Sequence, residues 1–291
     1  MSIKAAFLGL GVMGYPMAGH LANAGIAVTV WNRTSGKAEQ WAAQYPGSAG
    51  TSIAGTVSGA DFVFTCVGAD LDLKEIFTGP EGIIENASPG AVLVDHTTAS
   101  AGIAEHLAEL AGENRLGFVD APVSGGQQGA EKGQLTIMCG GDDQAFAKAK
   151  PLMEHYSKAL NLMGPVGSGQ KTKMVNQIAI AGLVQGLSEA LHFAQQAELD
   201  VQKVVDVISK GAAQSWQMEN RSATMIEGKF DHGFAVDWMR KDLAICLEEA
   251  RKNGSKIPVA ALVDQFYGDV QDMGGRRWDT SSLIQRLKGK R

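Results

Sequence analysis

Residues 3 to 35 read IKAAFLGLGVMGYPMAGHLANAGIAVTVWNRTS, and this stretch decides the fold. A short apolar run, Ile3 to Leu8, ends in a glycine-rich turn, GLGVMG, at residues 9 to 14. A segment rich in Ala and Leu follows, and then a second run with the composition of a β-strand, Ile26 to Trp31. The order strand, glycine turn, helix, strand is the context in which G-x-G-x-x-G predicts dinucleotide binding.

Each glycine of this turn has its own expected role. Gly9 permits the tight turn, Gly11 lets the backbone approach a pyrophosphate, and Gly14 lets the helix pack close to the strand. The helix that begins there offers free N–H groups and the positive end of its dipole to phosphates. We therefore predict that the whole turn binds the cofactor: Gly9, Leu10, Gly11, Val12, Met13 and Gly14.

The residues after the second strand-like run indicate which dinucleotide is bound. NAD enzymes commonly place Asp or Glu there, where the carboxylate binds the ribose 2′-hydroxyl. This chain has Asn32, Arg33 and Thr34 instead. Asn32 does not repel a 2′-phosphate, Arg33 can pair with it through two hydrogen bonds, and Thr34 adds a hydroxyl group. We predict NADP as the preferred cofactor, with NAD as the second choice; the alternative is that Arg33 is only a solvated loop residue.

Length, composition and charge restrict the class of protein. The chain has 291 residues, 45% hydrophobic and 20% charged, as is ordinary for a globular protein of one large or two medium domains. Its net charge of −5 argues against a nucleic acid partner. Its apolar stretches are shorter than the roughly 18 residues of a membrane span, and Met1 leads so directly into the first strand that no signal peptide is expected.

Cysteine and histidine usage adds two expectations. Cys66, Cys139 and Cys246 are far apart and lack CxxC spacing, and the first two lie in apolar runs, so we expect buried thiols and no disulfide framework. This usage suits a cytoplasmic location. The six histidines show neither HxxxH nor HxH spacing, so no metal site is predicted.

The order of elements predicts two domains. Strand-like and helix-like segments alternate in the first half, which is typical of a mostly parallel sheet covered on both faces. After residue 164 we find helical stretches and no convincing strand. We therefore predict an α/β Rossmann-type domain at residues 1–164 and an all-α domain, for substrate binding and oligomerisation, at residues 165–291. Val67, which ends one strand-like run, is expected to contact the cofactor. The other strand-like runs after Trp31 are Ala91–Asp95, Phe118–Val123 and Leu135–Cys139, and the later helical stretches are Val201–Lys210, Arg240–Lys252, Val259–Asp272 and Ser281–Lys288.

The first helical stretch, Gln170 to Ala197, is apolar on nearly every face. Such a helix is buried either in the centre of its domain or between subunits, so we predict a homodimer or homotetramer. Lys173, Asn176 and Gln177 lie three and four residues apart and share one face. A buried lysine is costly unless it is paired or functional, which favours a catalytic role for Lys173 over a structural one. Lys171 lies about 200° around the helix and is expected in solvent or near a phosphate.

Four blocks of the sequence resemble the β-hydroxyacid dehydrogenases. This family includes 3-hydroxyisobutyrate dehydrogenase, tartronate semialdehyde reductase and the glyoxylate/succinic semialdehyde reductases, and is similar in fold to 6-phosphogluconate dehydrogenase. The blocks extend over nearly the whole chain, and together they are highly specific. They read FLGLGVMG at 7–14, DAPVSGG at 120–126, GSGQKTKMVNQ at 167–177 and KDL at 241–243.

The resemblance implies two catalytic residues and one binding residue. The third block is similar to the family's G-x-G-x-x-x-K-x-x-N segment, which places the catalytic lysine at Lys173 and an orienting asparagine at Asn176. Lys241, in the fourth block, is expected to reach the active site. There it would neutralise a substrate carboxylate or support the nicotinamide side of the cofactor.

The resemblance also implies a substrate loop and a cofactor contact. The second block looks like the family's substrate-binding loop, and the Ser124 hydroxyl and the N–H groups of the Ser124-Gly125-Gly126 turn suit an anion such as a carboxylate. A plain tight turn is the alternative. Where relatives often read Asp-Met-Ser-Thr, this chain has Asp95-His96-Thr97-Thr98. Thr98 keeps the hydroxyl that contacts the cofactor, and His96 is expected to fill space rather than to catalyse.

The residues predict an NADP-dependent oxidoreductase, and the resemblance implies that it interconverts a small β-hydroxyacid and its semialdehyde. Hydride transfer would be coupled to proton transfer by a lysine general acid/base. The expected substrate is a small aldehyde or hydroxyacid that carries a carboxylate. One alternative is a non-catalytic NADP-binding scaffold. Another is a related reductase acting on a bulkier or imine substrate, although Lys173 argues against the imine reductases, which replace that lysine.

Overall fold

The structure is a computed structural model that describes residues 2–288; Met1 and residues 289–291, the end of the predicted helical domain, lie outside this range. The chain divides into two compact units, Met1–Lys173 and Met174–Arg291. The division falls inside helix α9, which spans Ser168–Gln196. The domain boundary at residue 164 stays a prediction.

The first unit is built on a sheet whose first six strands are parallel. The strand order is β3-β2-β1-β4-β5-β6-β8-β7, with β9 pairing β8. Strand β8 runs antiparallel to β6 and β7. The predicted Rossmann-type sheet is therefore confirmed. The strands are β1 (Lys4–Leu8), β2 (Ala27–Trp31), β3 (Gly47–Ala49), β4 (Phe62–Thr65), β5 (Val92–Asp95), β6 (Gly117–Asp120), β7 (Val123–Ser124), β8 (Leu135–Gly141) and β9 (Ser157–Leu162).

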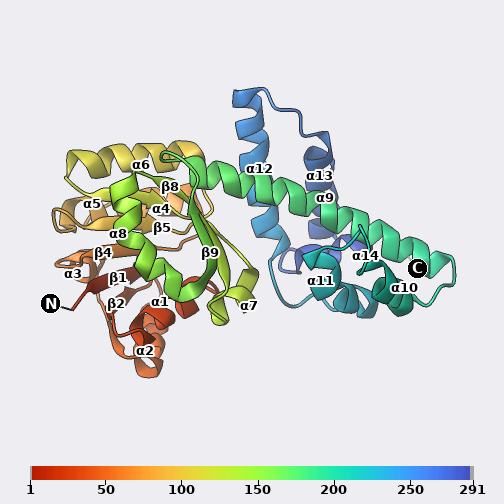
Figure 1. The fold of residues 1–291 in the computed structure, drawn as a ribbon, viewed down its shortest axis with the longest axis horizontal. Helices are drawn as coiled ribbons and strands as arrows, with labels where there is room; N and C mark the ends of the chain where they lie inside the picture. Colours follow the sequence, from red (N-terminus) through yellow and green to blue (C-terminus); the bar gives the residue numbers. More distant parts are fainter. Residues whose placement is uncertain (1, 289–291) are drawn as a thin grey trace. The chain divides into compact units, whose positions relative to one another are not determined.

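Helices cover both faces of this sheet (Figure 1). Alternate residues of a strand point to opposite faces, so Ala5 and Phe7 of β1 belong to one core cluster, and Ala6 and Leu8 to another. The first face packs against α1 (Gly14–Asn23), α2 (Ser35–Gln44) and α8 (Asp143–Met153). The second packs against α3 (Ile53–Val57), α4 (Asp70–Thr78), α5 (Ile83–Asn86) and α6 (Ala101–Glu113).

Two details of the sheet differ from the sequence prediction. The run Phe118–Val123 is interrupted, and β6 and β7 lie on either side of Pro122, because proline has no N–H for the ladder. Strands β3 and β9 were not predicted. The first is very short, and most residues of the second are not buried, so neither has a distinctive apolar pattern.

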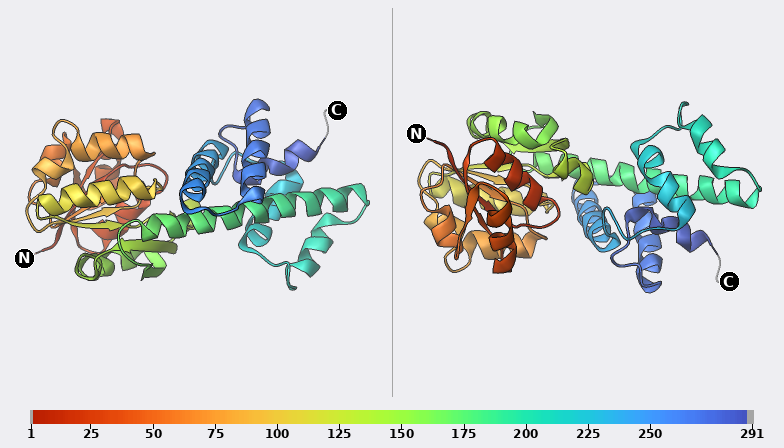
Figure 2. Two further views of the ribbon diagram at one scale, coloured as in Figure 1. Left: turned by 90° about the horizontal axis from the view of Figure 1, so that it is seen from above. Right: turned by 90° about the horizontal axis from the view of Figure 1, so that it is seen from below.

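Helices dominate the chain from residue 174 to residue 288 (Figure 2). Within that range the one β-type pairing is an isolated bridge between Ala235 and Asp279, so the all-helical prediction is confirmed. Helix α11 was not predicted, although Ser215 caps its start and the left-handed Gly228 ends it. The helices after α9 are α10 (Val201–Ile208), α11 (Trp216–Glu227), α12 (Val236–Asn253), α13 (Pro258–Asp272) and α14 (Leu283–Leu287), and two 3₁₀ turns of the chain are η1 (Glu154–Tyr156) and η2 (Thr280–Ser282).

Helix α9 is less enclosed than its composition suggests. Val175, Leu183 and Phe193 are 67%, 46% and 72% exposed. Burial in the centre of the domain is therefore wrong as an interpretation of this helix. Burial between subunits, which was the other interpretation, stays a prediction.

The described residues include all three cysteines and bear on the predictions about membrane spans and metal sites. Cys139 and Cys246 are buried, whereas Cys66 is only half-buried, contrary to the expectation; none of the three forms a disulfide bond. Among residues 2–288, no helix has the length and apolar character needed to cross a membrane. In the same range, no group of His, Cys, Asp or Glu side chains is arranged to hold a metal ion.

Candidate active site

The glycine turn between β1 and α1 has the geometry of a ligand cradle. Gly9 has φ +99°, and a Cβ there would lie 2.3 Å from the carbonyl oxygen of Cys66. A Cβ on Gly14 would lie 2.0 Å from the carbonyl oxygen of Gly9. In contrast, no heavy atom lies within 4 Å of a Cβ built on Gly11. Gly9 and Gly14 are thus required by the fold itself, whereas Gly11 leaves room for a group such as a pyrophosphate.

Asn32 connects this turn to the end of β2. Its Oδ1 accepts a hydrogen bond from the backbone N–H of Leu10 at 2.9 Å, and its Nδ2 donates to the carbonyl oxygen of Thr34 at 3.1 Å. The next residue, Arg33, extends into solvent and forms an ion pair with Asp72 of α4. Asn32 therefore has a structural role that the sequence did not suggest. The sequence also did not reveal that Arg33 has an acidic neighbour.

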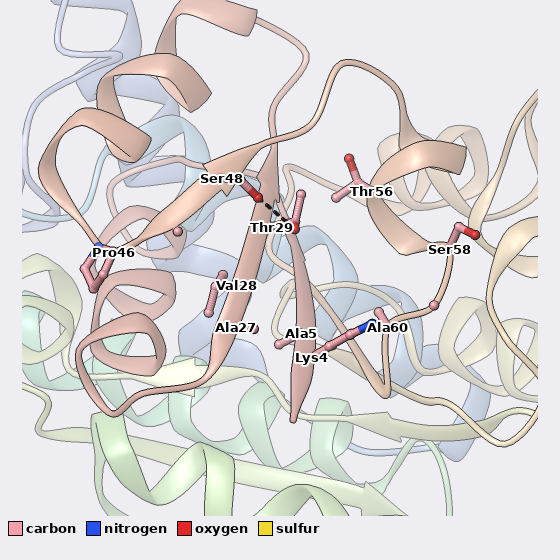
Figure 3. Close-up of a pocket in the computed structure, with 12 residues that line it drawn as sticks. Lys4, Ala5, Ala27, Val28, Thr29, Pro46, Ser48, Thr56, Ser58 and Ala60 are labelled. Atoms are coloured by element: carbon pink, nitrogen blue, oxygen red, sulfur yellow. Dashed lines mark hydrogen bonds between the residues drawn. The ribbon is translucent and has the colours of Figure 1, made fainter. Parts of the chain in front are cut away.

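Two pockets lie on the first unit, at different edges of the sheet. A pocket of about 620 Å³ is lined by Leu10, Gly11 and Val12 of the glycine turn and by Lys37. The other, of about 500 Å³, lies where the strands begin and includes Lys4 and the Thr29–Ser48 hydrogen bond (Figure 3). Ligands of open α/β sheets bind at the carboxyl ends of the strands. The pocket beside the glycine turn lies at that edge of the sheet, and the pocket in Figure 3 lies at the opposite edge.

The loop after β5 is held by a buried carboxylate. Oδ1 of Asp95 accepts hydrogen bonds from Oγ1 of Thr65 at 2.7 Å and from the N–H of Thr97 at 3.0 Å. Oγ1 of Thr97 in turn accepts from the N–H of Val67 at 3.0 Å. Burial raises the pKa of Asp95 to about 7. These contacts bring two predicted cofactor residues, Val67 and the half-buried Thr98, into one connected loop region.

His96 fills the interior beside this loop, as expected. Its Nδ1 lies 2.6 Å from the carbonyl oxygen of Ala121, and its Nε2 lies 2.9 Å from the hydroxyl of Tyr156. Burial lowers the pKa of His96 to about 4, so the ring is neutral at physiological pH. A neutral ring can donate through Nδ1 and accept through Nε2, which satisfies both nitrogens.

The predicted substrate loop begins where the short strand β7 ends. Ser124 is half-buried, and Gly125 and Gly126 have φ of +133° and +62°. Two successive residues with positive φ favour glycine, since side chains are strained there. Helix α7 (Gly126–Glu131) starts in this turn. The turn therefore places Ser124 two residues before the start of a short helix.

The amino end of α9 is fixed by Asp120, the last residue of β6. Its Oδ1 accepts a hydrogen bond from the N–H of Gly167, and its Oδ2 accepts one from the N–H of Gln170, both at 2.8 Å. Burial raises the pKa of Asp120 to about 6, and the backbone N–H donors oppose that shift. A Cβ on Gly169 would lie 2.5 Å from the carbonyl oxygen of Asp120. Glycine at 169 thus allows this close approach.

Lys173 and Lys171 have different environments on α9. Lys173 lies in the second turn of the helix and is only 7% exposed. The Lys171 side chain is 48% exposed and pairs with Glu105 of α6 at 3.1 Å. The prediction that Lys171 lies in solvent is confirmed, and Lys173 is the lysine that is withdrawn from water.

In the second unit, a polar network links Asn176 to Lys241. Nδ2 of Asn176 donates to Oε1 of Gln177 at 2.8 Å, and Nε2 of Gln177 donates to Oδ2 of Asp242 at 2.7 Å. The ammonium of Lys241 lies 3.2 Å from Oδ1 of the same carboxylate. Asp242 is buried, so this carboxylate is the centre of the network. Two predicted site residues from distant parts of the sequence are thereby connected.

Sequence reasoning missed four residues that hold the predicted site residues in place. Three are carboxylates, and two of these directly follow buried strand residues, which is a recognisable signal because the carboxyl ends of parallel strands form ligand sites. The fourth, Gln170, lies within a conspicuous motif but has no charge to draw notice. The four are Asp95, Asp120, Gln170 and Asp242.

The glycine cradle at the carboxyl edge of a parallel sheet, followed by a helical unit, defines a Rossmann-type NAD(P)-dependent oxidoreductase. Residues 4–164 match the family model described as the NAD binding domain of 6-phosphogluconate dehydrogenase. Residues 167–287 match the model described as NAD-binding of NADP-dependent 3-hydroxyisobutyrate dehydrogenase. The chain belongs to the 3-hydroxyisobutyrate dehydrogenase family, and the resemblance in its sequence motifs is confirmed.

Individual relatives agree with this assignment. The chain is 60% identical over 288 residues to an uncharacterized oxidoreductase of Shewanella frigidimarina, with 99% of each chain covered. It is 32% identical to 2-hydroxy-3-oxopropionate reductase of Escherichia coli, with 98% of this chain and 97% of the relative covered. The structure of Mycobacterium tuberculosis 3-hydroxyisobutyrate dehydrogenase with L-serine matches with a TM-score of 0.88 at 26% identity, covering 99% and 100% of the two chains. The chain is thus an NAD(P)-dependent hydroxyacid dehydrogenase or semialdehyde reductase, acting on CH–OH donors.

Proposed function

We propose that the protein interconverts a small β-hydroxyacid and its semialdehyde, with NADP as the preferred cofactor and Lys173 as the general acid/base. The substrates that fit are of the 3-hydroxyisobutyrate, tartronate semialdehyde, succinic semialdehyde or glyoxylate type. The observation that carries this proposal is the position of Lys173. It is a nearly buried lysine, one turn after a helix start that is anchored to the sheet by Asp120.

The proposed reaction needs a proton donor beside the reacting carbon. A nicotinamide bound at the glycine turn supplies or accepts the hydride. In the reducing direction the aldehyde oxygen develops negative charge, and the Lys173 ammonium donates a proton to it. In the oxidising direction the neutral amine of Lys173 takes the proton from the alcohol. Asn176 follows one helical turn later and, in this proposal, orients the lysine or the substrate oxygen.

Further residues are proposed to bind the substrate carboxylate. The Ser124 hydroxyl and the N–H groups around Gly125 and Gly126 provide hydrogen-bond donors in a turn that glycine keeps open. Lys241, whose ammonium is held by the buried Asp242, supplies a positive charge for the same carboxylate or for the nicotinamide side of the cofactor.

The proposed preference for NADP rests on the residues after β2. Asn32 and Thr34 are neutral, and Arg33 is the cation available for a 2′-phosphate. The remaining cofactor contacts in this proposal are the glycine turn, Val67 and Thr98. A homodimer or homotetramer and a cytoplasmic location stay predictions from the sequence; the exposed apolar side chains of α9 support the first.

A substrate panel tests the proposal. Semialdehydes and hydroxyacids of two to five carbons, uncharged aldehydes of matched length and cyclic imines would each be assayed with NADPH and NADH. We expect the highest kcat/KM for a carboxylate-bearing semialdehyde with NADPH. Equal turnover of the matched uncharged aldehyde would contradict the proposed carboxylate site, and preferred turnover of an imine would contradict the substrate class.

A further inference from the structure

One buried side chain connects the cofactor loop to the helix that carries Lys173. Gln170 is 1% exposed. Its Nε2 donates a hydrogen bond to the carbonyl oxygen of Thr97 at 2.7 Å, and its Oε1 accepts one from the N–H of Ala99 at 3.0 Å. The two contacts lie on either side of Thr98, the residue predicted to touch the cofactor. Gln170 therefore holds the backbone of this loop at two points.

The main chain of Gln170 is fixed as firmly as its side chain. Its N–H donates to Oδ2 of Asp120 at 2.8 Å, at the start of α9. Thr97 is held by two further hydrogen bonds. Its N–H donates to Oδ1 of Asp95, and its Oγ1 accepts from the N–H of Val67. Gln170 is thus the link between two groups of contacts, one at the ends of β4 and β5 and the other at the end of β6.

The contacts require an amide at position 170. The carbonyl oxygen of Thr97 needs a donor and the N–H of Ala99 needs an acceptor, and a primary amide offers both at once. An ionised carboxylate offers acceptors only, and an aliphatic side chain offers neither. Leaving buried backbone groups without partners is costly, so the loop would shift to satisfy them.

We propose that Gln170 is a positioning residue that sets the distance between the Lys173 ammonium and the nicotinamide-facing loop at Thr98. The inference rests on the proposed roles of Lys173 and Thr98. Lys173 follows Gln170 by three residues, or nearly one turn of a rigid helix, so displacement of one residue carries the other with it. A misplacement of about 1 Å at a reacting group can cost on the order of 100-fold in rate.

A pair of leucine variants on the same helix tests this role. Gln170→Leu removes both contacts to the loop, while Asp95 and Val67 still hold Thr97. We expect kcat to fall about 10- to 100-fold, with the KM for NADPH within about threefold of wild type. The primary isotope effect with 4-deuterated NADPH should increase, because the hydride step becomes more rate-limiting. The matched control is Gln185→Leu, at a buried glutamine whose Nε2 donates to Glu189 of the same helix. It should leave kcat and the isotope effect unchanged.

A glutamate variant provides a second and more specific readout. The protonated acid of Gln170→Glu has one donor and one acceptor and so reproduces the amide, whereas the ionised form cannot donate to Thr97. Burial and the neighbouring Asp120 carboxylate favour the protonated form and move its titration toward neutral pH. In the reducing direction we expect the variant to be active at low pH and to lose kcat as the pH rises, along a descending limb at lower pH than the one that loss of the Lys173 proton gives in wild type.

The outcomes separate this inference from the proposed function. A purely structural role would overturn the inference. It would lower the melting temperature and the number of active molecules, but it would leave a wild-type isotope effect in Gln170→Leu and a wild-type pH profile in Gln170→Glu. If Lys173→Ala is inactive while both Gln170 variants keep wild-type kcat, this inference alone fails. If Lys173→Ala keeps wild-type kcat, the proposed function fails first, and the role of Gln170 with it.

Discussion

Arg33 and Asp72 form an ion pair, with 3.3 Å between Nη1 and Oδ1, while the arginine side chain stays 77% exposed. The other oxygen of Asp72 accepts a hydrogen bond from the N–H of Ala69 at 3.1 Å, so the carboxylate is fixed at the start of α4. An exposed pair of this kind contributes little to stability. The pair bears on the proposed choice of cofactor, because a carboxylate beside Arg33 would compete with a 2′-phosphate for the same guanidinium.

Cofactor preference should therefore respond in opposite directions to changes at these two residues. Arg33→Ala should weaken NADPH binding by about 1.5–3 kcal/mol, the cost of a lost charged hydrogen bond, and leave NADH unaffected. Asp72→Asn should lower the KM for NADPH about two- to fivefold, because the competing charge is removed. Steady-state kinetics with both cofactors measure these effects. Equal losses for NADPH and NADH in Arg33→Ala would contradict the assignment of the 2′-phosphate to this residue.

The neighbouring lysines of α9 should differ sharply in their effect on turnover. Lys173→Ala removes the proposed general acid, which typically costs about 10²- to 10⁴-fold in kcat, while NADPH binding stays nearly intact. Lys171→Ala removes only an exposed pair with Glu105 and should change kcat less than about twofold. Turnover and fluorescence titration with NADPH would be measured for both. An inactive Lys171→Ala beside an active Lys173→Ala would refute the assignment.

Lys241 should matter according to the charge of the substrate. Lys241→Ala removes the proposed positive charge and should raise the KM for carboxylate-bearing substrates about tenfold or more, with a smaller change for uncharged aldehydes. The comparison of the two substrate classes is the internal control, since general damage to the network around Asp242 would affect both. The same increase in KM for both classes would argue that Lys241 serves the cofactor or the fold instead.

Asp95 should make stability depend on pH in an unusual direction. Burial raises its pKa from 3.8 to about 7, so the native state holds the proton that the unfolded state releases. The contribution of Asp95 to the free energy of unfolding is fully present below about pH 4 and is lost as the pH rises through about 7. The pKa of Asp120 is raised to about 6, so its effect on stability has the same direction. The pKa of His96 is lowered to about 4, so its contribution to stability is lost as the pH falls.

The Asp95→Asn variant isolates this contribution. Asparagine keeps an oxygen that can accept from Thr65 and Thr97 but does not ionise. Relative to wild type, the variant should gain on the order of 3 kcal/mol in the free energy of unfolding between pH 4 and pH 8. Urea unfolding across that range measures the difference, and the contributions of Asp120 and His96 cancel in it. A difference that stays constant with pH would show that Asp95 titrates normally.

The exposed apolar side chains of α9 predict self-association. Phe193, at 72% exposed, is a large apolar surface residue on a helix already rich in apolar residues. Light scattering should report a dimer or tetramer at micromolar concentration, and Phe193→Glu should weaken the assembly. The matched change Val207→Glu, at a residue also 72% exposed but on α10, should not. A wild-type monomer at that concentration would remove the prediction.

The sequence predicts the sheet well where a motif or a buried run carries the information. The turn GLGVMG and the apolar run before it locate β1 and α1, and the change in character near residue 164 predicts a helical second half. The strands and helices that were missed have weak patterns: β9 is largely unburied, and α11 is polar over much of its length. Strand β9 is held by its pairing with β8, which local composition cannot reveal. For α11 the available signals were its caps, Ser215 and Gly228, rather than a long apolar run.

The predicted site residues depend on partners that lie far away in the sequence. Gln170 meets Thr97 across 73 positions, and Gln177 meets Asp242 across 65. Motifs identify Lys173 and Lys241 as candidates, but the residues that hold their surroundings in place become visible only once the strand ends are assembled. The same limit applies to Arg33, since its pairing with Asp72 spans 39 positions.

Helices α1 and α9 differ in whether a side chain of the protein accepts hydrogen bonds at their positive amino ends. At neutral pH the Asp120 carboxylate accepts from Gly167 and Gln170, so the protein's own anion closes the start of α9. No side chain caps α1 at Met13. An incoming dinucleotide therefore meets one helix end already neutralised and one still able to attract phosphate. In the proposed binding mode, this asymmetry favours one orientation of the dinucleotide, with its pyrophosphate at α1 and its nicotinamide toward the start of α9, the helix that carries Lys173.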